Sequence, residues 1–195
     1  MTEINAAARW RAKVCARKLW HGETMTRYLV AYYSWFGTTA KAAEAIAAAL
    51  GADVEEITDA KPRRGLFVSI RSAIEAGREK PAPIVTPERN VADYDVVVLG
   101  FPVWASNMAS PMRGYIERAL AGAKPKSIAA FCTLGSSGAE KAFGKIEEAC
   151  GRKLAGSVAL NAEEMKKGAW REKAEAFASA LKSSDRLTVV GADAA

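Results

Sequence analysis

Short runs that suit β-strands alternate along most of this chain with segments that favour helices. The strand-like runs are YLVAYY (28–33), ADVEEI (52–57), DVVVLGF (95–101), SIAAFCTL (127–134) and KLAGSVAL (153–160). Helices are expected over residues 39–50, 66–77, 110–120, 139–150 and 168–182. Five repeats of strand and helix predict an α/β protein, with a parallel sheet covered by helices on both faces through right-handed crossovers.

The polarity of each run indicates where it lies in the sheet. DVVVLGF is the most apolar run and is expected at the centre, whereas ADVEEI is polar enough for an edge. In such sheets ligands bind beyond the carboxyl ends of the strands, near the point where the strand order reverses. Functional residues are therefore expected in the turns after the first, third and fourth strands, at 34–39, 102–110 and 133–138.

The two ends of the chain do not follow this layout. Residues 1–24 contain no strand-like run, and Met25 stands directly before the first one. We therefore expect the domain to span 25–183, with 1–24 as an extension and 184–195 as a loose tail. The extension is interpreted as a start-codon artefact, or alternatively as a short basic amphipathic helix that docks on the domain or on a membrane.

Composition narrows the class of protein. The chain has 195 residues, of which 50% are hydrophobic and 26% charged, as is typical of a soluble globular domain. Its cysteines are odd in number and lack a CxxC pair, which indicates reduced thiols in the cytoplasm and no zinc site. No apolar run is long enough for a membrane span or a signal peptide.

The positive charge is unevenly distributed. The net charge is +6, and residues 1–24 hold five basic and two acidic residues, which accounts for half of it. The remaining excess over 171 residues is weak for a nucleic-acid binder, so no nucleic-acid partner is expected.

The first turn has the composition of a phosphate site. Ser34, Thr38 and Thr39 supply hydroxyl groups, and Gly37 lets the backbone curl so that its amides point inward at a helix N-terminus. Each hydrogen bond to a charged oxygen contributes about 1.5–3 kcal/mol, so several such bonds hold a phosphomonoester without Lys or Arg. Ordinary helix capping by Ser and Thr explains the same residues equally well.

Other nucleotide-binding classes are excluded by their motifs. GxxxxGK[ST] is absent, and the first turn lacks GxGxxG, so acidic residues after the second strand are weak evidence for a dinucleotide site. Response-regulator receivers need aspartates at the ends of the first and third strands, and these strands have none.

The third and fourth turns suit a planar ring. Trp104 follows the central strand, and Ser106, Asn107 and Ser110 supply hydrogen-bonding groups beside it. The fourth turn, TLGSSGAE, contains glycines that permit close backbone approach from the other side. A tryptophan that only packs on the following helix, and a merely flexible loop, are the alternatives.

Together the three turns resemble the flavodoxin-like family, specifically its bacterial flavodoxin-domain proteins. The phosphate motif of that family is Ser/Thr-x-Thr-Gly-x-Thr, and Ser34, Gly37 and Thr39 match it. The resemblance covers about residues 27–182 and implies a three-layer α/β/α sandwich, a five-stranded parallel sheet of order 2-1-3-4-5, and non-covalently bound FMN. It implies a phosphate on Ser34, Trp35, Phe36, Gly37, Thr38 and Thr39, and a ring between Pro102, Val103, Trp104, Ala105, Ser106 and Asn107 on one side and Thr133, Leu134, Gly135 and Gly138 on the other.

Two positions depart from that family. Phe36 stands where a hydroxyl is expected, and Trp35 and Phe36 either cover the edge of the ligand or pack on a neighbour. Ala105 and Ser106 follow Trp104 where electron-carrier flavodoxins often have a glycine, so a backbone flip to positive φ costs more there, although Asn107 tolerates it. Stabilisation of a one-electron-reduced flavin is therefore expected to be weak.

These observations lead to two functional hypotheses. The first is an FMN-dependent oxidoreductase or electron-transfer protein. It either reduces a quinone-like small acceptor from NAD(P)H or passes electrons to a redox partner protein. No catalytic residue is assigned, because the only histidine, His21, lies in the extension and Cys132 and Cys150 fit core positions.

The second hypothesis is a cofactor-free flavodoxin-like domain for interaction or regulation, which the missing hydroxyl at Phe36 favours. The oligomeric state is left open.

Overall fold

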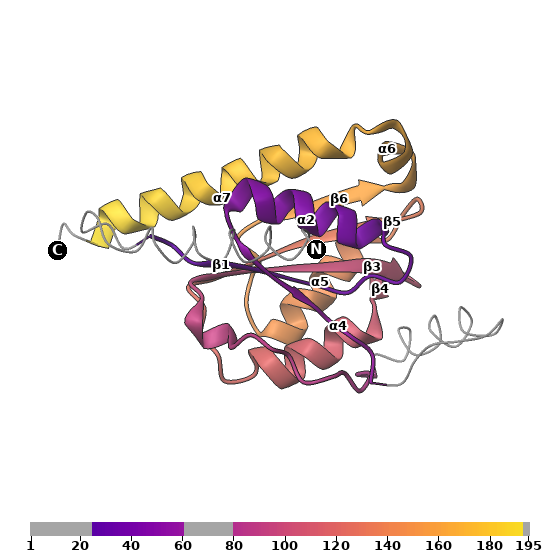
Figure 1. Ribbon diagram of the computed structural model, residues 1–195, viewed down its shortest axis with the longest axis horizontal. Coiled ribbons are helices and arrows are strands. Elements are labelled where there is room, and N and C mark those ends of the chain that lie inside the picture. Colours follow the sequence, from indigo (N-terminus) through magenta and orange to yellow (C-terminus); the bar gives the residue numbers. More distant parts are fainter. Residues whose placement is uncertain (1–24, 61–79, 193–195) are drawn as a thin grey trace, which may run out of the picture.

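A computed structural model describes residues 25–60 and 80–192, with the side chains described as far as Ser184. The extension 1–24, the helix expected over 66–77 and residues 193–195 lie outside the described residues. The described chain forms a twisted sheet with helices on both faces (Figure 1).

The sheet has the predicted strands in the predicted order. Its parallel strands are β1 (Tyr28–Tyr32), β2 (Asp53–Glu56), β3 (Val96–Trp104), β5 (Ser127–Leu134) and β6 (Ser157–Asn161). Their order is β2-β1-β3-β5-β6, which is the order 2-1-3-4-5 when the parallel strands are counted along the chain. The apolar β3 lies at the centre and the polar β2 at an edge, as their compositions predict.

Helices cover the sheet from two sides and produce the expected three layers. Helices α2 (Thr38–Leu50) and α7 (Trp170–Ala192) pack on one face. The other face carries α4 (Ser110–Tyr115), the π-helix η3 (Ile116–Leu120) and α5 (Ala139–Cys150). A single 3-10 turn, η2 (Val91–Asp93), precedes β3.

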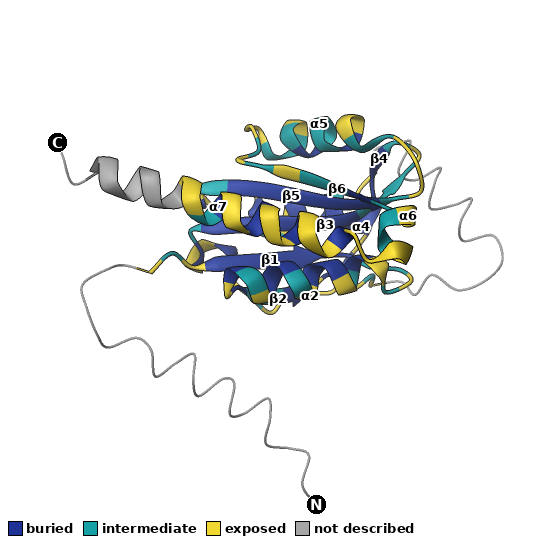
Figure 2. Ribbon diagram, turned by 90° about the horizontal axis from the view of Figure 1, so that it is seen from above, coloured by how far each residue is buried: buried dark blue, intermediate teal, exposed yellow. Residues whose placement is uncertain are grey.

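Alternation along the strands explains why the core has two halves. Successive strand residues point to opposite faces, so Leu29 and Ala31 of β1 pack toward α4 and α5, while Val30 packs toward α2 and α7. All three are fully buried. Figure 2 shows the buried strands enclosed between helices whose outer faces are exposed.

Several boundaries differ from the sequence-based prediction. β3 runs on to Trp104 and turns back into a short antiparallel strand, β4 (Asn107–Met108). The last strand begins at Ser157 rather than 153, and an additional helix, α6 (Ala162–Lys167), follows it. Helix α7 continues to Ala192, ten residues beyond its predicted end, so residues 184–192 of the segment expected as a tail are helical.

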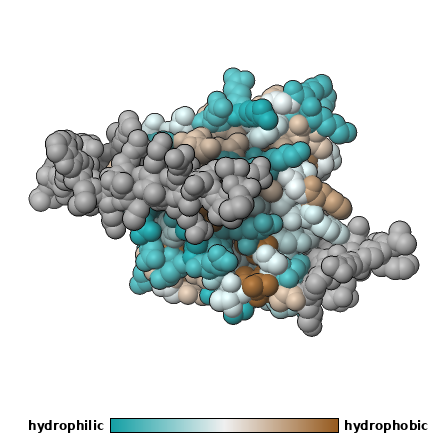
Figure 3. All heavy atoms as spheres, in the orientation of Figure 1, coloured by the Kyte–Doolittle hydropathy of each residue, from teal (hydrophilic) through white to brown (hydrophobic). Residues whose placement is uncertain are grey.

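Few large hydrophobic side chains are exposed in the described part of the chain. Within 25–60 and 80–192, no helix is both long and apolar enough to cross a bilayer. The face in Figure 3 is largely hydrophilic, with its hydrophobic atoms in small separate areas. The large hydrophobic side chains that are exposed in the described part are Met25, Phe36 and Val85.

Candidate functional site

The candidate site lies at the carboxyl ends of the three central strands. Because β1, β3 and β5 are adjacent and parallel, the segments that follow them leave the sheet at the same edge. These segments are the turn 33–37, the β3–β4 hairpin and the turn 135–138. The structure therefore brings the three predicted turns together.

The first turn presents unpaired backbone donors at the start of α2. Gly37 adopts a left-handed conformation, with φ 79°, and α2 begins at Thr38. The first amides of a helix have no partner within it, and no side chain caps this end. The alternative interpretation of this turn, ordinary capping by Ser or Thr, is thus wrong. The open amides and the partial positive charge of the helix end suit an anion.

The hydroxyl groups of this region differ in how they are satisfied. The Oγ of Ser34 is buried and has no hydrogen-bond partner among the described residues. Thr39 is buried, and its Oγ1 is hydrogen-bonded at 2.8 Å to the Oγ1 of Thr133 at the end of β5. That bond joins the first turn to the fourth. A buried hydroxyl without a partner costs about 1–3 kcal/mol, which a hydrogen bond from Ser34 to a ligand oxygen would offset.

The β3–β4 hairpin is a tight two-residue turn made without glycine. Val103 pairs with Met108 and Trp104 with Asn107, so Ala105 and Ser106 form the turn. Their φ angles are 49° and 58°, as a type I′ turn requires. A left-handed conformation costs a non-glycine residue roughly 1–2 kcal/mol. Ala105 and Ser106 thus already have the positive φ that the sequence analysis expected to be costly without a glycine.

Pro102 and Val103 lie in the sheet, although the sequence analysis assigned them to the third turn. β3 extends through both, and Pro102 is aligned with Thr133 of β5. Asn107 is buried in β4, where its side-chain oxygen accepts the Met108 N–H at 2.9 Å. These residues position the hairpin.

Gly138 allows the hairpin to approach the fourth turn. Gly138 stands directly before α5 with φ 99°, and a Cβ atom on it would lie 2.8 Å from the Oγ and 2.9 Å from the Cα of Ser106. Any side chain here would push the two turns apart. The contact observed is with Ser106 of the hairpin, whereas the close approach to a planar ring that the sequence analysis expected of this glycine stays a prediction. Gly135 is exposed in this turn, whereas Leu134, which the sequence analysis assigned to it, is the last residue of β5.

An aromatic cluster connects the first turn to the hairpin. Trp35 stacks on Phe36, with centroids 4.9 Å apart, and meets Trp104 edge to face at 5.4 Å. Tyr33 also contacts Trp104, at 5.7 Å. Of the two possibilities for Trp35, packing on a neighbour is the one observed, while Phe36 remains 83% exposed. The sequence analysis did not include Tyr33 among the site residues, although it ends a predicted strand at the edge of the sheet where ligands were expected.

The cysteines near the sheet are unsuited to nucleophilic chemistry. Burial raises the pKa of Cys132 to about 12 and that of Cys150 to about 11, so both thiols are protonated at neutral pH. This agrees with their interpretation as core residues. Within the described ranges, no group of three or more His, Cys, Asp or Glu residues is placed to hold a metal ion.

The donor set fits a phosphate attached to an aromatic ring system. No residue of the turn 34–39 is charged, so the donors that this turn offers to an anion are amides and hydroxyls. The aromatic cluster and the hairpin lie beside it and supply an apolar surface. Lys41 is exposed on α2, one helical turn from Gly37.

Comparison with known proteins places this arrangement among flavoproteins. A family model described as flavodoxin matches residues 27–174. Solved structures with a similar fold include a protein from Bacteroides uniformis described as a flavoprotein, with 28% sequence identity and a TM-score of 0.64. The match covers 73% of this chain and 96% of that one.

Two further structures have the same architecture. One, from Bacteroides eggerthii and also described as a flavoprotein, is 25% identical with a TM-score of 0.59, over 76% of this chain and 97% of that one. The other is a flavoprotein from Lactobacillus acidophilus in complex with FMN. It has 21% identity and a TM-score of 0.61, over 73% of this chain and 98% of that one.

Proposed function

Since this chain belongs to the flavodoxin family, we propose that it binds FMN and acts in electron transfer. FMN is the ligand of the L. acidophilus structure, which shares the fold. When bound, FMN supplies the redox chemistry, and the protein supplies binding, orientation and electrostatics.

The unpartnered Ser34 hydroxyl beside the open amides of α2 is the observation that carries this proposal. Ser34 Oγ has no hydrogen-bond partner in the described part of the chain, and the helix end has no capping side chain. A phosphate dianion accepts hydrogen bonds from both kinds of donor. Thr38 and Thr39 stand at the same helix start, where Thr39 is fixed by Thr133.

The ring of the cofactor is assigned to the hairpin and the fourth turn. Trp104 and Trp35 offer aromatic surfaces at the carboxyl ends of β3 and β1, and such contacts add about 0.5–1.5 kcal/mol each. Ser106 and Gly138 hold the two turns at a fixed separation. Pro102, Val103, Ala105, Asn107, Leu134 and Gly135 complete the walls of this assigned site.

Within this proposal we favour a small, planar electron acceptor of the quinone class, with NAD(P)H as donor. The exposed Phe36 ring stacks on Trp35 next to the assigned site and offers a flat apolar surface to an incoming ring. Electron carriers that dock on proteins typically have a strong negative charge. Residues 25–195 lack it, because they carry half of the net charge of +6 and are therefore slightly positive.

The absorption spectrum of the purified protein tests the assignment. A yellow protein that releases FMN on heating is the expected result, and NAD(P)H oxidation that accelerates when a quinone is added would support the small acceptor. A protein that neither retains flavin nor binds added FMN would refute the proposal. It would leave the cofactor-free interaction domain as the remaining hypothesis.

A further inference from the structure

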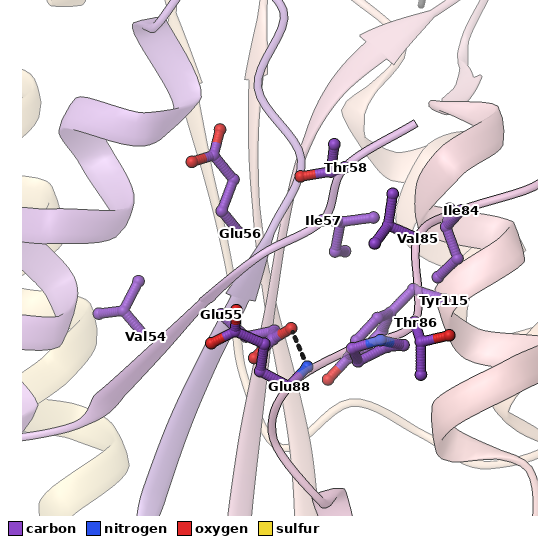
Figure 4. Close-up of a pocket in the computed structure, with 11 residues that line it drawn as sticks. Val54, Glu55, Glu56, Ile57, Thr58, Ile84, Val85, Thr86, Glu88 and Tyr115 are labelled. Carbon is purple, nitrogen blue, oxygen red and sulfur yellow. Dashed lines mark hydrogen bonds between the residues drawn. The ribbon is translucent and has the colours of Figure 1, made fainter. Parts of the chain in front are cut away.

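A pocket of about 270 Å³ lies beside the edge strand β2, apart from the site described above. β2 and the residues that follow it form one wall, and the connector 84–88 forms the other. Tyr115, the last residue of α4, closes its base (Figure 4). None of the residues assigned to the flavin lines it.

The two walls are held in place by hydrogen bonds. Glu55 accepts the backbone N–H groups of Glu88 at 2.9 Å and of Arg89 at 3.1 Å. Arg118 donates to the carbonyl of Ile84 at 3.3 Å and to the hydroxyl of Thr86 at 2.8 Å. The pocket is thus a fixed feature of the fold.

Tyr115, which lines this pocket, has a polar atom that the protein does not use. The residue is fully buried, and its Oη has no hydrogen-bond partner among the described residues. Burial, and then the negative charge of Glu55, raise the pKa of Tyr115, so the phenol stays protonated. The π-helix η3 begins at the next residue, and π-turns are frequent at functional sites. Buried hydroxyl groups are nearly always hydrogen-bonded, so this one is open to a partner from outside the protein, a water or a ligand.

The charges that face the pocket are negative. Glu55 is only 7% exposed, and Glu88 stands at the rim. Glu56 turns away from the pocket in Figure 4 and hydrogen-bonds Tyr32. No Lys, Arg or His lines the pocket, and the nearby Arg89 is paired with Asp53 at 3.3 Å. The hydrogen bonds of the Glu55 carboxylate come from backbone amides, and Arg89, whose charge also acts on Glu55, is engaged by Asp53, so the remaining negative charge favours a positively charged ligand.

We propose that this pocket binds a primary ammonium group carried on a short aliphatic stem. An ammonium group has three N–H donors. Both Glu55 oxygens retain lone pairs beyond the amides that they accept, and the Tyr115 oxygen offers another. Ile57 and Ile84 supply apolar surface for the stem. Among the described residues, no group of three or more His, Cys, Asp or Glu side chains is placed to hold a metal ion, so the pocket does not suit Ca²⁺.

Titration with n-butylamine, followed by amide NMR spectra of the full chain, tests this proposal. The backbone amides of Glu88 and Arg89 bond Glu55, so both signals should shift saturably, while that of Thr39 should not. n-Butanol has the same stem without the charge, and it should bind at least about tenfold more weakly. Equal binding of the two, or no saturable shift, would overturn the proposal.

Substituting Tyr115→Phe isolates the unused hydroxyl. This variant keeps the buried ring and is expected to fold, but its affinity for n-butylamine should fall about tenfold, since one hydrogen bond to a charged group is lost. Tyr94→Phe is the matched control, because Tyr94 bonds Asp53 at 2.8 Å and does not line the pocket. Unchanged affinity in Tyr115→Phe, or an equal loss in both variants, would contradict the assignment.

Two probes distinguish the sources of such a group. Tighter binding of 1,4-diaminobutane than of an Nα-acetyl-lysine amide would support the pocket and identify a free amine. The reverse order would support it and identify a lysine side chain of a partner. If neither shifts the Glu88 and Arg89 amides, the proposal is wrong, whereas FMN binding is independent of this outcome.

Discussion

At the scale of single residues, the site depends on polar atoms that the protein itself leaves unsatisfied. Ser34 has a buried hydroxyl without a partner, although a chain optimised only for stability would place alanine there. Thr39, five residues further along the chain, has its hydroxyl paired with Thr133. The hydroxyl of Ser34 is therefore available to a ligand, whereas that of Thr39 connects α2 to β5.

Replacing Ser34 by alanine should therefore weaken FMN binding without weakening the fold. The loss of one hydrogen bond to a charged oxygen predicts an affinity about tenfold lower or more. The apoprotein should melt at the same temperature or higher, because no internal bond is lost. Flavin fluorescence quenching and thermal melting measure the two effects. Ser157→Ala, at an exposed position of β6, is the control and should change neither.

The contact between Gly138 and Ser106 predicts that a side chain at position 138 lowers the free energy of unfolding more than one at other left-handed glycines. Gly138→Ala should destabilise the protein by the cost of a left-handed alanine, about 1–2 kcal/mol, plus about 1–3 kcal/mol for the clash with Ser106. Gly168→Ala provides the comparison, because Gly168 has φ 84° and its Cβ would meet nothing within 4 Å. Urea unfolding of both variants measures the difference. Equal losses would mean that the close approach of the two turns does not constrain the fold.

At the scale of elements, the ends of the central strands are tied together opposite the site. Asp95 precedes β3, and its carboxylate accepts the Arg27 N–H at 2.8 Å and pairs with Lys126 at 3.1 Å. Its own carbonyl accepts the N–H of Ser127, the first residue of β5. One residue thereby holds the starts of β1, β3 and β5 in register.

This arrangement predicts a pH-dependent contribution to stability. Burial alone would raise the pKa of Asp95, but the Arg27 amide and Lys126 outweigh it and lower the pKa. The stabilisation is then fully present above the unfolded pKa of about 3.9 and disappears as the pH falls through the lower folded value. Asp95→Asn should lose about 1 kcal/mol at pH 7 and much less at pH 2, by urea unfolding. A loss that is independent of pH would contradict this account.

The elements also show which local signals a sequence carries. α6 was missed although Asn161 and Glu164 form a capping box, in which each side chain accepts the backbone N–H of the other residue; that spacing is visible in NAEE. The β3–β4 hairpin had no such signal, because Ala105 and Ser106 are unusual at positive φ. Tertiary packing against Gly138 accompanies that conformation, and no local pattern reports it.

At the scale of the whole molecule, the hydrophobic pattern was sufficient for the layers and for the central and edge strands, whereas the full strand order came from the resemblance to the flavodoxin-like family. Apolar β3 and polar β2 occupy the centre and the edge because burial on two faces selects their compositions. The convergence of the three turns followed from parallel topology alone. The hydrogen bond between Thr39 and Thr133 connects residues far apart in the sequence, and the pocket at Tyr115 is lined by three separate segments. Neither feature could be predicted from the sequence.

The domain boundary proposed at Met25 makes a prediction for the whole chain. The two described core clusters draw on residues from Tyr28 to Leu181, and the family match begins at residue 27. A chain that starts at Met25 should therefore unfold at the same urea concentration as the full chain and bind FMN equally well. A large drop in either property would show that residues 1–24 belong to the functional domain.

The central claim is that an uncharged turn at the start of α2 holds the phosphate of FMN. Titration of the flavin-free protein with FMN and, in parallel, with riboflavin tests it most directly, because the two ligands differ only in the phosphate. The account predicts that FMN binds at least about 100-fold more tightly, since several hydrogen bonds to a charged group depend on it. Equal affinities, or no binding of either ligand, would contradict it.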